Sequence, residues 1–250
     1  MKQLLSFFTI SNFEITSIKL HYLIIFFLIF GISILIINLV VYLSQKYKHK
    51  SIVLSLQKKR ISNTLRFSCI NNSKPLFCCF DYFKKSTFSP LDESKRAGTA
   101  FYKITKKTLP STARRQISHV SLSGWQSKLY KSISGGNIYL RCHLVGFQLC
   151  GENSNPLNII TGTQDFNIKG MLPFEDKVCS YVKKTGKPVL YRVTPIYSKG
   201  GSIAKGVWME AYSCFNKTIR FSVFVYNRQD NFFIDYTTGT SMKLFKTKNK

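Results

Sequence analysis

The stretch RCHLVGFQLCGENSNPLNIITGTQDFNIKGMLPFEDKV, residues 141–178, decides which fold this chain of 250 residues adopts. Its first residues belong to an apolar run that predicts a buried strand over 139–149. Arg141, Cys142 and His143 stand side by side within that run. An unpaired charge away from water costs several kcal/mol, so these polar groups face either solvent or a functional site.

An amphipathic helix is predicted at the C-terminal end of the same stretch. The residues that commonly bound a helix are all present: Pro173, Glu175, Asp176, Lys183, Lys184 and Gly186. Phe174, Val178 and Val182 fall at i, i+4 and i+8 and form one apolar stripe. The asparagine-rich segment 151–171 that leads to this helix is too polar and too rich in glycine to predict one regular element.

Three strands are predicted further along the chain, over 189–197, 206–213 and 219–227. These segments are rich in β-branched and aromatic residues, and turn residues separate them. They are expected to be neighbours in an antiparallel sheet. Together with the helix they predict an α+β fold.

The charge balance of the chain is strongly basic. It has 37 Lys and Arg against 11 Asp and Glu, a formal net charge of +26. Such an excess favours a polyanionic partner such as nucleic acid or anionic lipid, although a biased amino-acid composition produces the same count without any binding role. The seven cysteines form no C-x-x-C pair and are odd in number, which favours free thiols over a paired zinc site or a complete disulfide framework.

A transmembrane helix is predicted near the N-terminus. The 22 residues of 22–43 carry no charge, and as a helix they span roughly 33 Å, enough for a hydrocarbon core of about 30 Å. An uncleaved anchor is favoured over a signal peptide, because no A-x-A site follows. The expected organisation is therefore a tail and anchor over 1–43, a basic juxtamembrane linker over 44–65 and one folded domain over 66–250, with the membrane as a partner of residues 20–43.

The sidedness of this anchor is left open by the flanking charges. Six basic residues follow the apolar segment and two precede it, namely Lys46, Lys48, Lys50, Lys58, Lys59 and Arg60 against Lys2 and Lys19. Taken alone, this asymmetry favours a cytoplasmic domain. The rule weakens for long domains, so an extracellular domain remains the expectation.

The quoted stretch resembles the DNA/RNA non-specific endonucleases of the secreted Gram-positive branch. VLYRVTPIY, GVWMEAYS, FSVFVYN and IDYTTG follow it in the family's order, and INNSKPLF, KRAGTAFYKI and SGWQSKLY precede it. The resemblance covers about residues 67–241. It implies a ββα-metal nuclease fold with a central antiparallel sheet, and Mg²⁺-dependent hydrolysis of DNA, with RNA as a further substrate, that leaves 5′-phosphate ends. Mn²⁺ and other divalent cations are compatible with the same site.

The resemblance also implies roles for individual residues. His143, in Leu140-Arg141-Cys142-His143, matches the general base of the family's D-R-G-H type motif, and imidazole suits that task because its pKa lies near neutrality. The match makes Asn167 the metal ligand. Its remaining assignments are Glu175 as the acidic residue that orders metal-bound water, Asn158 as a supporting residue, and Arg141 and Arg192 as phosphate-holding groups.

Leu140 departs from the family pattern, which carries Asp or Asn at that position. This departure keeps a second hypothesis open, a weakened, membrane-tethered protein that binds nucleic acid without cutting it. A thiol nucleophile at Cys142 is disfavoured because adjacent strand residues point to opposite faces. Simpler roles are expected elsewhere: structural pairing with basic residues for Glu210 and Asp235, a turn position for Asn155, and surface or membrane-boundary positions for His21, His49 and His119.

Overall fold

The computed structural model describes the backbone of residues 2–62 and 64–244 and the side chains of 21–62, 64–78 and 80–244. The chain divides into two compact units, residues 1–48 and 49–250. Helix α1, Lys2–Lys58, continues from the first unit into the second, so much of the segment expected as a linker is helical. Among the described residues, α1 is the one helix long and apolar enough to cross a membrane.

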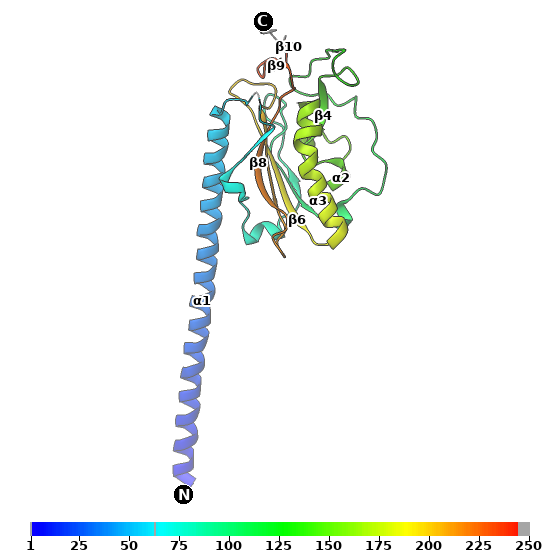
Figure 1. The fold of residues 1–250 in the computed structure, drawn as a ribbon. Helices are drawn as coiled ribbons and strands as arrows, with labels where there is room; N and C mark the ends of the chain where they lie inside the picture. Colours follow the sequence, from blue (N-terminus) through cyan, green and yellow to red (C-terminus); the bar gives the residue numbers. More distant parts are fainter. Residues whose placement is uncertain (1, 63, 245–250) are drawn as a thin grey trace. The chain divides into compact units, whose positions relative to one another are not determined.

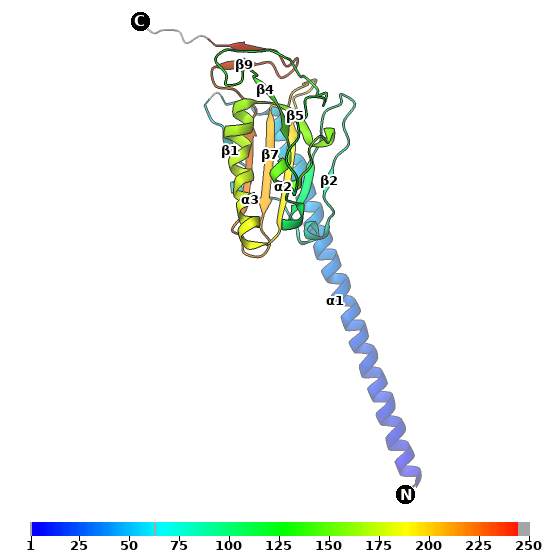
Figure 2. The same cartoon turned by 90° about the vertical axis from the view of Figure 1, so that its right-hand side faces the viewer.

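A six-stranded antiparallel sheet forms the centre of the second unit, as Figures 1 and 2 show. In spatial order its strands are β1 (Phe67–Cys69), β8 (Arg220–Tyr226), β7 (Gly206–Tyr212), β6 (Val189–Ile196), β3 (Ala100–Ile104) and β2 (Thr87–Phe88). The three predicted late strands are confirmed as β6, β7 and β8, within one or two residues at their ends.

The two faces of this sheet bury different side chains. Val193, Met209 and Val223 are partners across β6, β7 and β8, and they belong to the main core with helix α3, Leu172–Thr185. We call this side the α3 face, which Figure 2 views through the helix. Thr194, Trp208 and Phe224 are partners on the opposite side, the outer face.

Helix α3 is bounded and oriented as its sequence predicts. Val178 and Val182 are fully buried, and Phe174 packs partly buried against the same core, which confirms the apolar stripe. Gly186 ends the helix in a left-handed conformation, φ 69°, which glycine adopts without a steric penalty.

A separate hairpin precedes α3 and completes a strand-strand-helix unit. Strand β4, Tyr139–His143, pairs antiparallel with β5, Ile159–Thr163. The strand predicted over 139–149 is therefore too long, because the chain leaves β4 at His143 and forms the short helix α2, Phe147–Cys150. The α+β fold with its ββα unit agrees with the expected fold class.

The remaining elements are short. They are the 3-10 helices η1 (Asn71–Ser73), η2 (Cys79–Phe83), η3 (Lys106–Thr108) and η4 (Pro156–Asn158), the π-helix η5 (Phe166–Met171), and the paired strands β9 (Phe232–Ile234) and β10 (Ser241–Lys243).

Candidate active site

His143 ends β4 and is buried, with 5% of its surface exposed. Its Nε2 lies 2.8 Å from the carbonyl oxygen of Asn153. Because a carbonyl only accepts hydrogen bonds, Nε2 carries the proton and donates, which leaves Nδ1 as the acceptor nitrogen of the ring. Burial, and to a smaller extent the charge of Arg114, lowers the pKa of His143, so the ring stays neutral at pH 7.

Asn158 holds the turn that follows His143. Its backbone oxygen accepts from Leu144 N at 2.7 Å. Its side-chain amide makes two further bonds with Val145, accepting from the backbone N at 2.8 Å and donating to the carbonyl at 3.0 Å. These bonds replace the strand ladder, which is why β4 ends where it does. Asn158 is fully buried, in keeping with the expected supporting role.

Glu175 lies in the first turn of α3 and is 7% exposed. Its carboxylate fits against the bare Cα of Gly146, where a Cβ would stand 2.3 Å from Oε2. Burial, reinforced by the charge of Asp176, raises the pKa of Glu175 to about 8. None of the ion pairs among the described residues involves Glu175. A buried carboxyl without a cation is typical of a functional position.

Arg114 connects these two groups electrostatically. This exposed residue lowers the pKa of both His143 and Glu175. Arg114 lies in a loop whose residues show no helix or strand spacing. The only feature of the sequence that draws attention to it is the pair of adjacent arginines, Arg114 and Arg115. The sequence also gave no sign that the Asn153 carbonyl holds His143.

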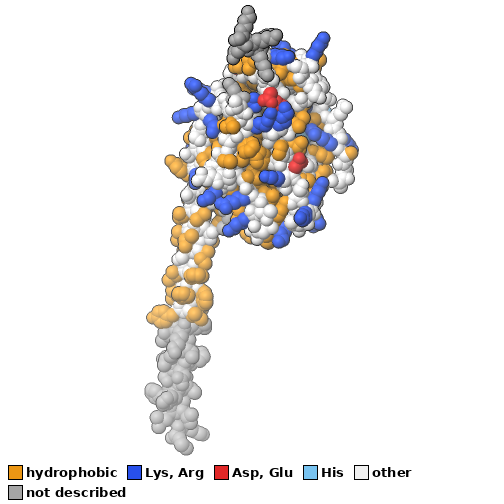
Figure 3. All heavy atoms as spheres, in the orientation of Figure 1, with side chains coloured by type: hydrophobic (Ala, Val, Ile, Leu, Met, Phe, Trp, Pro, Cys, Tyr) orange, Lys and Arg blue, Asp and Glu red, His pale blue; other side chains and the backbone are white. Residues whose placement is uncertain are grey.

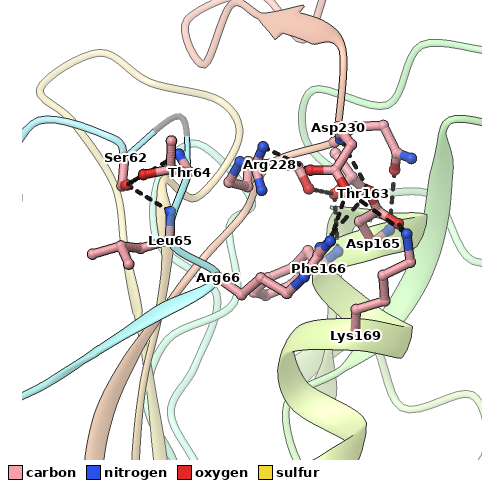
Figure 4. Close-up of polar contacts among 11 residues, drawn as sticks. Ser62, Thr64, Leu65, Arg66, Thr163, Asp165, Phe166, Lys169, Arg228 and Asp230 are labelled. Carbon is pink, nitrogen blue, oxygen red and sulfur yellow. Dashed lines mark hydrogen bonds and ion pairs between the residues drawn. The ribbon is translucent and has the colours of Figure 1, made fainter.

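Asn167 lies on η5, a wide helical turn of a kind often found at functional sites. It is half-buried, and among the described residues its side-chain amide has no hydrogen-bond partner. The turn itself is held firmly, as Figure 4 shows: Thr163 Oγ1 accepts from Phe166 N, and Asp165 binds Lys169 at 2.6 Å and accepts from Asp230 N at 3.0 Å.

Arg66 anchors the same network from the start of the domain. Its guanidinium lies 2.6 Å from Asp230 Oδ2 and 3.9 Å from Asp165 Oδ2 (Figure 4). The chain just before β1 is thereby attached to the turn that carries Asn167.

The side chains of Asn167 and Glu175 are each of a kind that suits a hard divalent cation. An amide oxygen without a protein partner and a carboxylate without an ion pair are ligands or water-orienting groups of the kind Mg²⁺ accepts. No cluster of three or more His, Cys, Asp or Glu side chains that could hold a metal ion is found among the described residues.

Cys142 and His143 point to opposite sides of β4, as expected. A Cβ on Gly162 would lie 2.6 Å from both Cys142 Sγ and the Phe166 ring, so the thiol faces the core. Full burial raises the pKa of Cys142, which keeps it protonated and excludes a thiolate nucleophile. Leu140 also packs, partly buried, against the main core.

Arg141 shares the side of β4 that carries His143 and is held by the segment that covers it. Its Nε donates to the Val120 carbonyl at 2.8 Å, and its guanidinium lies 4.3 Å from the centre of the Trp125 ring. The remaining donors of this half-buried side chain are the ones that a phosphate would use.

Arg192 does not join this group of residues. It lies on the outer face of the sheet, where its guanidinium binds Glu210 at 2.7 Å and donates to the Leu76 carbonyl. Strand alternation places neighbouring Tyr191 on the α3 face and Arg192 on the other. The sequence-based expectation of a phosphate-holding Arg192 is thus corrected to a structural ion pair, and the structural role expected for Glu210 is confirmed.

The other simple expectations divide. Asn155 caps η4 by accepting from Leu157 N, as a turn residue does, and His119 is exposed. The expectation that Asp235 pairs with a basic residue is wrong, because its carboxylate accepts hydrogen bonds from Thr237 N and the Thr238 hydroxyl instead. His49 is wrong as a surface residue, because its ring stacks on Trp208 with centroids 4.6 Å apart.

Comparison with known proteins finds a family model that matches this chain. The family model described as DNA/RNA non-specific endonuclease matches residues 81–214. NucA from Streptococcus agalactiae with magnesium bound has a similar structure, with a TM-score of 0.64 and 22% identity over 76% of this chain and 96% of that chain. The Sda1 nuclease with bound zinc has a TM-score of 0.55 and 25% identity over 65% of this chain and 81% of that chain. A search of curated proteins finds no match.

Proposed function

The chain belongs to the DNA/RNA non-specific endonuclease family and is a nuclease that hydrolyses phosphodiester bonds, and from that premise we propose that His143 is its general base. The reaction is a divalent-metal-dependent cleavage of DNA, with RNA as a second substrate. Nδ1 of His143 takes a proton from water, the water oxygen attacks phosphorus, and the bond to the 3′-oxygen breaks.

The observation that carries this proposal is the hydrogen bond from His143 Nε2 to the Asn153 carbonyl. It fixes the tautomer in which Nδ1 is free to accept a proton. The lowered pKa of His143 keeps this base in its neutral, active form below the pH at which an exposed histidine becomes charged.

Asn167 and Glu175 are the residues we propose to hold and orient the metal. Mg²⁺ is the proposed ion, with Mn²⁺ as a substitute, and the similar nucleases NucA and Sda1 carry magnesium and zinc. When bound, such an ion stabilises the charge that develops on the phosphoryl and departing oxygens. Glu175 would orient water in its ionised form, which a bound cation would favour.

Arg114 and Arg141 are the proposed phosphate contacts. Arg114 is exposed, and its charge acts on both His143 and Glu175, which supports a phosphate-binding role in the same part of the domain. On the face of the domain that Figure 3 shows, Lys and Arg side chains are spread over the surface and acidic ones are few, as expected for binding without base recognition. Affinity for nucleic acid should therefore fall steeply with salt.

Residues 22–43 are the proposed membrane anchor, with the nuclease domain outside the cell. The apolar composition of α1 supports a span, and the basic residues after it favour the opposite orientation. Protease digestion of intact cells, scored on the domain, distinguishes the two orientations.

Cleavage of supercoiled plasmid by the full chain with Mg²⁺ tests the catalytic proposal. We expect His143→Ala and Asn167→Ala each to reduce the rate by at least about 10²-fold. His119→Ala is the matched control, because it removes an exposed histidine from the same part of the chain. Equal rates for His143→Ala and His119→Ala would overturn the assignment of the base.

The same assay decides the alternative of binding without turnover, which the apolar side chain of Leu140 favours. A wild-type chain that binds plasmid in a salt-sensitive manner, yet leaves it uncut with Mg²⁺ or Mn²⁺, would support that alternative. Wild-type cleavage rejects it.

A further inference from the structure

Tyr82, Phe83 and Phe215 form a cluster of aromatic rings at one end of the domain, and Phe80 lies on the same 3-10 helix as Tyr82 and Phe83. Phe80, Phe83 and Phe215 are 41%, 79% and 60% exposed. Tyr82 joins two of them, with ring centroids 5.5 Å from Phe83 and 6.1 Å from Phe215. We call these four residues the aromatic end. Phenylalanines gathered in this way on a surface indicate an interaction site, whereas scattered ones do not.

Basic residues surround the aromatic end. Lys84, Lys85, Lys217 and Arg220 are all exposed. Asp81 is the acidic residue among them, and it is 4% exposed and already bound to Lys84 at 2.5 Å. A pocket of about 570 Å³ opens between the aromatic rings and two of the basic side chains, Lys217 and Arg220. The surface therefore offers apolar rings and positive charge together.

The aromatic end lies away from the candidate active site. Glu175 is at the N-terminal end of α3, and Tyr181, nearer its C-terminal end, donates to Asn216 in the β7–β8 turn beside Phe215. Figures 1 and 2 both show the β7–β8 turn and the end of α3 at the same edge of the domain, opposite β9.

Followed from Leu56 back toward the N-terminus, the chain runs toward the aromatic end. Leu56 packs with Ile196 and Tyr226 at one end of the outer face. His49 stacks on Trp208, which belongs to the next row of side chains on that face. The pocket is lined by the row at the far end of the same strands, Leu190, Tyr212 and Arg220. From Leu56 back to His49, the chain thus leads away from the end of the sheet that holds Ile196 and Tyr226 and toward the aromatic end.

The candidate span ends close to this point. Five residues lie between Leu43 and His49, which makes six residue steps, so even a fully extended connection keeps His49 within roughly 21 Å of the membrane surface. A domain held so near a bilayer samples its surface continuously. The part of the domain that interacts most favourably with lipid headgroups then determines which face of the domain points toward the membrane.

We propose that the aromatic end docks on an anionic phospholipid surface. Aromatic rings enter the interfacial region of a bilayer, and each lysine or arginine beside them contributes about 1 kcal/mol of attraction to anionic lipid. Docking in this orientation turns the His143 region away from the lipid, toward nucleic acid in solution. The inference rests on the proposed anchor at residues 22–43 and does not depend on turnover.

Fluorescence quenching by brominated lipid tests the docking. The full chain is reconstituted in vesicles of phosphatidylcholine with or without phosphatidylserine, with Phe83→Trp as the probe. Phe233→Trp is the matched control, because Phe233 is also exposed (53%) and lies on β9 at the opposite edge. The unsubstituted chain supplies the background from Trp125 and Trp208. We expect quenching of Phe83→Trp only, stronger with the anionic lipid.

Removing one positive charge tests the electrostatic attraction between the aromatic end and anionic lipid. Lys217→Ala, combined with the probe, should reduce the ratio of docked to undocked chain about fivefold in anionic vesicles. Lys243→Ala, at an exposed position in β10, should leave it unchanged.

Three outcomes would overturn the proposal. One is equal quenching at positions 83 and 233, and another is a chain that does not float with vesicles of either composition. The third is Phe83→Trp fluorescence that responds to a single-stranded oligonucleotide but not to lipid, which would assign the aromatic end to base stacking instead.

Discussion

Two glutamates are buried on opposite faces of the same sheet, and their surroundings differ. Glu210, on the outer face, is fully buried and bonded to Arg192 at 2.7 Å and to Leu76 N at 2.7 Å. Glu175, on the α3 face, fits against Gly146 without any cation bound to it. Burial pushes the pKa of both carboxyls upward. Arg192 and the Leu76 N–H oppose this shift at Glu210, whereas Gln148, the Gly146 backbone and the charge of Arg114 oppose it at Glu175.

The difference separates a structural carboxylate from one available for chemistry. A paired and hydrogen-bonded charge contributes to a stable interior, and breaking the pair leaves its partner uncompensated. An unpaired buried carboxyl destabilises the fold whenever it is ionised. Such a cost is expected where the group serves a bound cation or a reacting water.

Glu210→Ala should cause the largest loss of stability. It leaves the Arg192 guanidinium without its carboxylate, and we expect the free energy of unfolding to fall by about 3–5 kcal/mol. Urea denaturation followed by tryptophan fluorescence measures this change. The double variant Arg192→Leu, Glu210→Met should recover most of the loss, because both charges are then removed together. A single variant as stable as the wild type would show that the pair contributes nothing.

Glu175→Gln should change how stability depends on pH. Below the usual pKa of 4.5 the carboxyl is protonated in both states, so Glu175 has no effect. Between 4.5 and about 8 the folded protein retains a proton that the unfolded chain has released, so stability falls as pH rises, by on the order of 1 kcal/mol per pH unit. Glutamine cannot ionise and removes this slope.

Denaturation of both proteins in a chelating buffer, at about pH 5 and about pH 8, measures the slope. The variant should resemble the wild type at the lower pH and exceed it at the higher one. Parallel curves for the two proteins would contradict the raised pKa of Glu175.

Gly146→Ala should have an intermediate effect. The new Cβ would overlap the Glu175 carboxylate, at 2.3 to 2.9 Å from three of its atoms. We expect a loss of about 1–3 kcal/mol in the free energy of unfolding, together with reduced plasmid cleavage. In the background of Glu175→Ala the same substitution should cost much less, because the overlap is gone. Additive losses in this double-mutant cycle would show that the two residues do not interact.

The regular parts of the fold follow from local patterns in the sequence. Strands β6 to β8 and helix α3 were predictable because their apolar residues recur at strand or helix spacing and bury one face. Strand β5 was missed because its threonines and glycine resemble a loop, although all five residues are buried by neighbours distant in sequence.

The candidate site was predictable only in part, for a related reason. The roles of His143, Asn158, Asn167 and Glu175 are predicted from the motif order of one continuous stretch, and they stay predictions. Arg192 was misassigned because a motif does not reveal its burial beside Glu210. Arg114 was missed because its relation to His143 arises only from tertiary folding. A pKa raised by burial, as at Glu175, has no local signature at all.

Lys169→Met should have the smallest effect on stability. It tests which contacts hold the turn that carries Asn167. Lys169 is half-exposed, and Asp165 keeps its contacts with Arg66 and Asp230 N without it, so we expect a change below about 1 kcal/mol. If the network serves to position Asn167, the Mg²⁺ concentration for half-maximal cleavage should rise while stability is preserved. Lys183→Met, an exposed lysine at the other end of α3, is the control. An unchanged Mg²⁺ requirement would mean that Thr163 and the backbone suffice to hold the turn.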